Sequence, residues 1–193
     1  MVEQLVMDAR SVRRFEETQE IGRDVLEGLI GVARLSPSAA NLQPLKYRLV
    51  DDGAEKAALY PALSWAGYLK DWPGPDPGER PGGYIVITRD RELKAIDKLL
   101  MCDVGIVGMA IQLRAREIGL GCCMIASFTA GKLVGALKLP EQFEPLLVLA
   151  LGTPKERVVP DDLAPGGGIE YYRDASRVHH VPKRTLAEVI IEG

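Results

Sequence analysis

Apolar residues recur at helical spacing in two long stretches of the chain. Residues 22–35 and 94–118 both place apolar side chains three and four positions apart, on one face of a helix. Pro37 and the turn Gly119-Leu-Gly121 end these patterns, because proline lacks an amide hydrogen and glycine commonly follows a helix. The sequence therefore predicts helices over 22–35 and 94–118. Asp103 falls on the apolar stripe of the second helix.

Shorter patterns between and around these helices predict the remaining elements. Apolar runs predict strands at 47–50, 84–88, 122–127 and 146–151, a helical turn or two is expected over 55–60, and a helix over 130–138. The segments 61–83 and 153–178 are expected to be irregular, and 185–191 to end the chain as a short strand or helix. Helices that interleave with about four or five strands indicate one domain over residues 1–193, α/β or α+β, with a covered sheet.

Composition and charge narrow the class of protein. The 193 residues are 47% hydrophobic and carry a formal net charge of −3, so no overall positive field favours nucleic acid or an anionic membrane as partner. The longest apolar runs, 104–111 and 145–152, are far shorter than the roughly 20 residues of a membrane helix. The first residues do not have the pattern of a secretory signal, and three cysteines suit reduced thiols. We expect a cytoplasmic protein without nucleic-acid or membrane partners.

Arginines gather near the start of the chain. Arg10, Arg13 and Arg14, together with Ser11, bring three guanidinium groups and a hydroxyl into five residues. Such a group could bind a phosphate through paired hydrogen bonds or hold the edge of an anionic ring. The alternative is a solvated basic turn that pairs with the following Glu16 and Glu17.

Hydrogen-bonding side chains gather in residues 36–44, SPSAANLQP. Asn41 and Gln43 each carry a donor and an acceptor and could read the alternating C=O and N–H edge of a heterocycle. The alternative is a helix stop whose side chains cap backbone groups. Turn chemistry explains Pro37 and Ser38 but does not require Gln43.

Two later segments are further candidates. In Gly119–Ser127, backbone amides at the turn could donate to a ligand, and the small Ala126 and Ser127 permit close contact. In 179–184, Lys183 and Arg184 could complete a phosphate site. The two histidines of that segment lack matching ligand spacing, which favours structural or surface histidines over a metal site.

Other reactive residues favour structural roles. Cys122 and Cys123 lie in an apolar strand and fit small buried hydrophobes, with a thiol-redox role as the alternative. We expect Asp103 to pair with an arginine or to cap a helix break near Gly105, with a catalytic acid as the alternative. The sequence shows neither a Ser/His/Asp elbow nor a dinucleotide fingerprint.

The motifs, in this order, resemble the nitroreductase family of FMN-dependent NAD(P)H oxidoreductases. The resemblance covers nearly the whole chain and is carried by four stretches: Arg10-Ser11-Val12-Arg13-Arg14-Phe15, Ser36-Pro37-Ser38-Ala39-Ala40-Asn41-Leu42-Gln43-Pro44, Gly119-Leu120-Gly121-Cys122-Cys123, and Lys183-Arg184. It implies an α+β fold, a three-layer sandwich with a mixed, mostly antiparallel central sheet covered by helices. It also implies a domain-entwined homodimer with two FMN sites at the subunit interface.

The resemblance also implies the residues that bind FMN. They are Arg10, Ser11, Arg13, Pro37, Ser38, Asn41, Gln43, Ala126, Ser127, Lys183 and Arg184. The arginine motif would contact the phosphate, ribityl chain and pyrimidine edge, and the basic tail would meet the phosphate. Residues 37–43 would lie along the isoalloxazine, from the same or the partner subunit, and the backbone of 126–127 would approach flavin N5.

The implied reaction is a ping-pong cycle in which NADH or NADPH reduces FMN, leaves, and is replaced by a small-molecule acceptor such as a nitroaromatic or quinone. Hydride chemistry belongs to the cofactor, which explains why the chain needs no catalytic triad. Two alternatives keep the flavin: other chemistry of the same superfamily, such as reductive dehalogenation or flavin cleavage, and a non-catalytic flavin-binding module. Trp65, Tyr68 and Trp72 of the proline-rich segment could stack on an aromatic substrate or serve the core or an interface.

Overall fold

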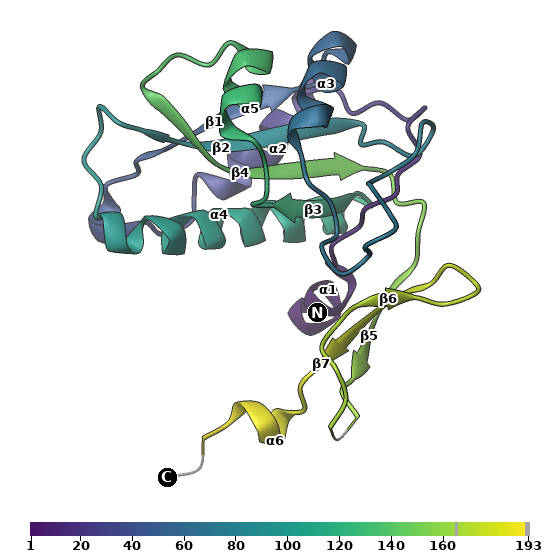
Figure 1. The fold of residues 1–193 in the computed structure, drawn as a ribbon. Helices are drawn as coiled ribbons and strands as arrows, with labels where there is room; N and C mark the ends of the chain where they lie inside the picture. The colour runs from purple at the N-terminus through teal and green to yellow at the C-terminus, as the bar shows by residue number, and fades with distance from the viewer. Residues whose placement is uncertain (165, 192–193) are drawn as a thin grey trace.

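The computed structural model describes residues 1–164 and 166–191, and its centre is an antiparallel sheet between two layers of helices (Figure 1). Four strands lie in the order β1–β2–β4–β3, with every neighbouring pair antiparallel. They are β1 (Leu45–Val50), β2 (Gly83–Asp90), β4 (Phe143–Gly152) and β3 (Gly121–Ile125). The α+β sandwich expected from the sequence is confirmed.

Helices cover both faces of this sheet. One layer contains α2 (Arg23–Ala33) and α4 (Asp97–Glu117), which pack against each other, and the other contains α3 (Gly53–Leu59) and α5 (Ala130–Leu137). In Figure 1, α3 and α5 lie above the sheet and the long α4 lies below it. A short helix α1 (Val2–Asp8) precedes the domain, and single 3₁₀ turns, η1 (Ala39–Asn41) and η2 (Tyr60–Ala62), follow α2 and α3. None of the helices in the described ranges is long and apolar enough to cross a bilayer.

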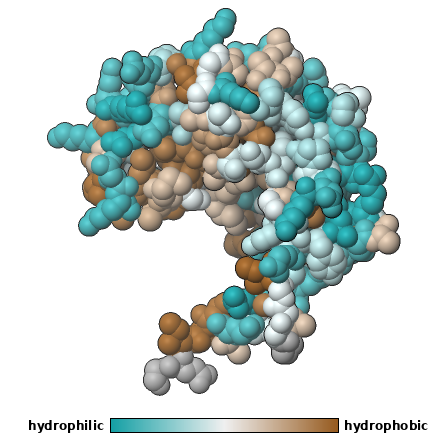
Figure 2. Space-filling view, viewed as in Figure 1, coloured by the Kyte–Doolittle hydropathy of each residue, from teal (hydrophilic) through white to brown (hydrophobic). Residues whose placement is uncertain are grey.

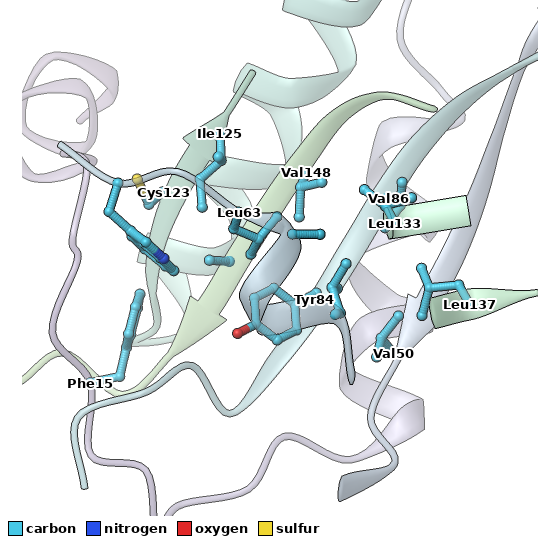
Figure 3. Close-up of a cluster of buried hydrophobic side chains, with 14 of the residues drawn as sticks. Phe15, Val50, Leu63, Tyr84, Val86, Cys123, Ile125, Leu133, Leu137 and Val148 are labelled. Atoms are coloured by element: carbon cyan, nitrogen blue, oxygen red, sulfur yellow. The ribbon is translucent and has the colours of Figure 1, made fainter. Parts of the chain in front are cut away.

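Alternation along the strands builds two hydrophobic cores. On β2, Tyr84 and Val86 point to the α3/α5 layer, whereas Ile85 and Ile87 point to the α2/α4 layer. The same alternation runs along β4, and Figure 3 shows the first of these cores, with Phe15 closing one end of it. Strands that are buried on both faces read as continuous apolar runs, which is why both strands could be recognised in the sequence.

A second, three-stranded sheet lies beside the main body (Figure 1). β5 (Val158–Asp162) pairs in parallel with β7 (His179–Lys183), and β6 (Tyr172–Arg173) pairs antiparallel with β7. Among the strands of the described residues this is the only parallel pair, and in the central sheet only the isolated bridge of Ser11 with Cys122 of β3 is parallel. The expectation that 153–178 is irregular is wrong for β5 and β6. Both strands are short and half exposed, so they lack the apolar alternation that marks a strand in the sequence.

The other expected elements are confirmed with small differences in their ends. The two long helices begin and end within the predicted ranges, and β1 and β4 each extend beyond theirs by two or more residues. The last helix, α6 (Leu186–Val189), lies within the segment expected to end the chain as a strand or helix. It projects away from the body in Figure 1. Sequence patterns gave no indication of α1 or β7.

Candidate functional site

The segment between α2 and β1 adopts a strained conformation. Ala40, Asn41 and Gln43 have φ values of 48°, 55° and 50°, in the left-handed region that residues other than glycine rarely occupy. Each such residue costs on the order of 1–3 kcal/mol and persists where the surroundings hold it. Asn41 and Gln43 are exposed, so the strained backbone presents two amide side chains at the surface. The predicted helix stop is present, but turn chemistry alone does not require this conformation.

Asp103 of α4 holds the start of this segment. Its carboxylate is buried and accepts hydrogen bonds from the Ser38 hydroxyl (2.7 Å) and from the Ala39 amide (2.9 Å). The Ser38 Oγ in turn accepts from the Gln43 amide (3.1 Å). The expectation that Asp103 pairs with an arginine or caps a helix break is wrong, because α4 continues without a break through Gly105 and the carboxylate faces the preceding segment.

A cavity of about 200 Å³ opens beside this segment. It lies between the end of α2, the start of β1 and α4, and its walls are both polar and apolar. Asp103 and Tyr47 both line it. Burial, and next the negative charge of Asp103, raise the pKa of Tyr47, so its hydroxyl stays protonated at neutral pH. Ser38 and Gln43 from the predicted site line this cavity as well.

The arginine motif packs against the start of β3. The Val12 amide donates to the Cys122 carbonyl (3.0 Å), and Ser11 forms a bridge with Cys122. This approach requires glycine at position 121, because a Cβ there would lie 2.9 Å from the Val12 Cβ. The Arg10 side chain folds back on its own helix end and donates to the Ala9 carbonyl (3.1 Å).

Arg13 lies at the contact between the arginine motif and the small sheet. Its guanidinium stacks on the Tyr171 ring at 4.7 Å and bonds the His179 Nε2 at 3.2 Å. Burial, and then the charge of Arg13, lower the pKa of the fully buried His179 to about 4. The ring is therefore neutral at pH 7 and accepts the proton of Arg13 at Nε2. The Arg13 amide donates to the buried carboxylate of Glu156, which also pairs with Arg173 (2.9 Å).

Arg14, by contrast, serves the core. It makes a two-pronged ion pair with Glu79, and their side chains are only 6% and 12% exposed. The hydrogen bond between them raises the pKa of Arg14 and lowers that of Glu79. Neither a phosphate-binding Arg14 nor pairing with Glu16 or Glu17 is therefore seen. Arg10 and Arg13 have no carboxylate partner for their side chains among the described residues, although these side chains bond carbonyl groups and His179.

The basic tail lies apart from these arginines in the single chain. Lys183 ends β7 four residues after His179, which is roughly 13 Å along an extended strand. Arg184 lies 3.9 Å from Glu188 of α6 and is exposed. A phosphate contact of Lys183 and Arg184 remains a prediction.

Ala126 and Ser127 directly follow β3 and are exposed. The Ser127 carbonyl accepts from the Ser64 amide (2.9 Å), so the proline-rich segment lies alongside them. Trp65 of that segment is buried in the core, whereas Tyr68 is half exposed. The core interpretation is thus confirmed for Trp65.

The predicted site residues form separate groups in one chain. Ser38 is held at Asp103 of α4, while the Gln112 side chain, nine residues further along the helix, donates to the Ala9 carbonyl (2.9 Å) beside the arginine motif. Nine helical residues span roughly 13 Å. Arg10, Ser11 and Arg13 do not line the cavity beside Ser38.

The donor set matches the two ends of an FMN molecule. Arg10 and Arg13 supply charge for a phosphate, while the exposed amides of Asn41 and Gln43 supply donors and acceptors for a ring edge that alternates C=O and N–H. No group of three or more metal-ligating side chains occurs among the residues that the structure describes. Both cysteines of β3 are buried, which raises their pKa, for Cys123 to about 11.

Sequence reasoning missed the groups that hold the site in place. Asp103, Glu79 and Glu156 each bind a partner more than 60 residues away in the chain. The position of Asp103 on an apolar helical stripe was a signal of burial, but it did not identify the partner.

Comparison with known proteins gives a consistent result. The family model described as Nitroreductase family matches residues 6–153. The CLA biosynthesis enone reductase of Lactiplantibacillus plantarum is 25% identical over 184 residues, covering 77% of this chain and 83% of the relative. A nitroreductase family protein from Clostridium novyi NT superposes with a TM-score of 0.66 at 25% identity, covering 80% of this chain and 86% of its own. For an FMN-dependent nitroreductase from Clostridium difficile R20291, the TM-score is 0.64 at 23% identity, with 81% and 89% covered.

Proposed function

Since the chain belongs to the nitroreductase family, we propose that it is an FMN-dependent oxidoreductase. It takes electrons from NADH or NADPH and passes them to a small-molecule acceptor in a ping-pong cycle. The working form is a homodimer in which both copies contribute to each flavin site.

The separation of the predicted flavin residues carries this proposal. Asn41 is exposed and Arg13 is half-buried, and their groups are anchored about nine residues apart along α4. One chain offers phosphate donors in one place and ring-edge donors in another. A second copy that brings its residues 37–43 to the first copy's arginine motif completes a single site.

Exposed apolar side chains support the homodimer. Met101 and Ile106 of α4 are 57% and 39% exposed, and Leu186 of α6 is 74% exposed. Figure 2 shows apolar surface along the lower edge of the body, where α4 lies, and on the projecting C-terminal arm. An apolar surface of this kind marks a protein–protein contact, and the second copy is the partner we propose.

Each group of residues has a defined role in this proposal. FMN, when bound, supplies the hydride chemistry. Arg10, Ser11 and Arg13 hold the phosphate end, with the tail Lys183 and Arg184 as further cations. Residues 37–43 hold the ring edge, and the exposed backbone at 126–127 leaves room for close approach of the ring. The neutral His179 keeps Arg13 in place without adding a competing charge.

The acceptor is a small organic molecule. Nitroaromatics and quinones are the first candidates, and the enone reductase among the relatives adds α,β-unsaturated ketones to the classes to be tested. We also propose the cytoplasm as the location, which the free thiols of Cys102, Cys122 and Cys123 support.

The visible spectrum of the purified protein tests the proposal. A flavin absorption band is expected, which bleaches when NADH or NADPH is added without oxygen and returns when a nitroaromatic, quinone or enone acceptor is added. A colourless protein that also fails to bind added FMN contradicts the proposal. A flavin that only an external reductase can reduce favours the other chemistries of the superfamily. Bound FMN with no turnover favours a flavin-binding module.

A further inference from the structure

The Asp103 carboxylate is a buried acid whose partners lie in the proposed flavin-binding segment. The side chain belongs to α4, and the residue is only 4% exposed. Both of its hydrogen bonds go to the segment: Oδ2 accepts from the Ser38 hydroxyl (2.7 Å) and Oδ1 from the Ala39 amide (2.9 Å). Bonds to an ionised carboxylate are about twice as strong as neutral ones.

The hydrogen bonds continue from Asp103 to the far end of the segment. While donating to Asp103, the Ser38 hydroxyl accepts from the Gln43 amide (3.1 Å). The segment therefore closes on itself across Ser38, and Asp103 fixes the closing group to α4. The Gln43 side chain then donates to the Asn41 carbonyl (3.2 Å) within the closed loop.

This closed loop contains three of the six non-glycine residues with positive φ in the described part of the chain: Ala40, Asn41 and Gln43. Left-handed backbone at residues with a Cβ costs roughly 1–2 kcal/mol per residue, so a free segment would leave this conformation. The hydrogen bonds that Asp103 accepts from Ser38 and Ala39 fix the segment to α4 and offset this cost. Strain of this kind gathers where a protein must present particular groups.

We propose that Asp103 is a positioning residue, which holds residues 38–43 in the strained conformation that directs Asn41 and Gln43 toward the flavin, without touching the flavin itself. This role rests on the proposed FMN-dependent function. It also gives the buried acid a purpose other than acid–base catalysis, since both of its oxygens are occupied by the segment.

The substitution Asp103→Asn tests the role with little change in shape. The oxygen of the new amide still accepts one bond, now without a charge, while its NH₂ group faces the second donor, so that bond is lost. We expect the FMN dissociation constant to rise about 10- to 100-fold. It is measured by titrating apoprotein at a temperature where circular dichroism shows every variant folded. Asp97→Asn is the matched control, because Asp97 lies on the same helix and is exposed, with Arg89 as its partner (2.8 Å).

A second substitution separates positioning from general damage. Glycine adopts positive φ without steric cost, so Ala40→Gly added to Asp103→Asn removes part of the strain. We expect the double variant to bind FMN about fivefold more tightly than Asp103→Asn alone. Failure of glycine to recover any affinity overturns the role, because the loss would then not arise from the strained backbone.

Hydrogen exchange of the apoprotein gives a readout that does not depend on flavin. Peptides that cover residues 36–44 are expected to exchange about tenfold faster in Asp103→Asn than in the wild type or in Asp97→Asn. If the wild type binds FMN but Asp103→Asn leaves the exchange or the FMN affinity unchanged, the positioning role is wrong while the proposed function stands. If the wild type binds no FMN, the proposed function fails and the positioning role falls with it. If Asp103→Asn does not fold, Ser38→Ala removes one of the two bonds and is expected to weaken FMN binding in the same direction.

Discussion

The ion pair between Arg14 and Glu79 joins the arginine motif to the proline-rich segment. Both side chains are nearly buried, and the two contacts between them form a fork. The Phe15 amide also donates to the Glu79 carbonyl (2.9 Å), so the same residue holds the backbone next to the pair. Glu79→Gln keeps the shape and this backbone bond but leaves the Arg14 cation without its counter-charge.

Breaking a buried pair from one side costs about 3–5 kcal/mol, because the remaining charge stays buried. For a chain of 193 residues, each kcal/mol moves the melting temperature by about 2–4 °C. Glu79→Gln is therefore expected to lower the melting temperature by roughly 6 °C or more. Because association adds to stability, wild type and variant are compared at the same protomer concentration.

The matched control is Glu117→Gln, which breaks the pair with Arg114. These side chains are 57% and 41% exposed, and exposed pairs contribute less than about 1 kcal/mol. Both variants remove the charge of a glutamate that pairs with an arginine, but only the Arg14–Glu79 pair is buried. Equal and small shifts in melting temperature for both variants would show that burial does not make the Arg14–Glu79 pair important for stability.

The remaining predictions concern pH, packing and thiol reactivity. The hydrogen bond from Arg14 lowers the pKa of Glu79. The stability from this pair is therefore present above the unfolded carboxyl pKa of about 4.3 and is lost as the pH falls through the folded pKa. The difference in melting temperature between wild type and Glu79→Gln should shrink in acid. Gly121→Ala should cost about 1–3 kcal/mol and weaken FMN binding, because its Cβ would lie 2.9 Å from that of Val12; thermal unfolding and FMN titration measure both. Burial raises the pKa of Cys122 and Cys123, so a thiol reagent at pH 7 should modify no residue but Cys102 in the folded protein and all three after unfolding.

Much of the sandwich could be predicted because burial on both faces leaves a strong mark on the sequence. The runs of β2 and β4 and the stripe of α4 are dictated by the two cores, and Gly119, with φ of 84°, marks the end of α4. The small sheet left no such mark. Its strands are half exposed and pair across distances in the chain that a local pattern does not report.

The site shows the same division between local and distant contacts. Asn41 and Gln43 could be identified from the sequence because residues 36–44 carry more hydrogen-bonding side chains than a turn requires. The supporting acids could not, since Asp103 meets Ser38 and Glu79 meets Arg14 only after the chain folds back. A charged residue on an apolar stripe predicts burial, but its partner is known only when the packing is known.

A flavin site shared between two copies is tested most directly by asking whether two defective copies can complete one site. Arg13→Ala and Asn41→Ala, each expressed alone, are expected to lose FMN binding and NAD(P)H-dependent flavin reduction. When the two variants are co-expressed and pair at random, half of the dimers are mixed, and each mixed dimer has one intact site. A site shared between two copies predicts recovery of about a quarter of the wild-type flavin sites. No recovery in isolated mixed dimers, although both variants fold and pair, would contradict a site shared between two copies.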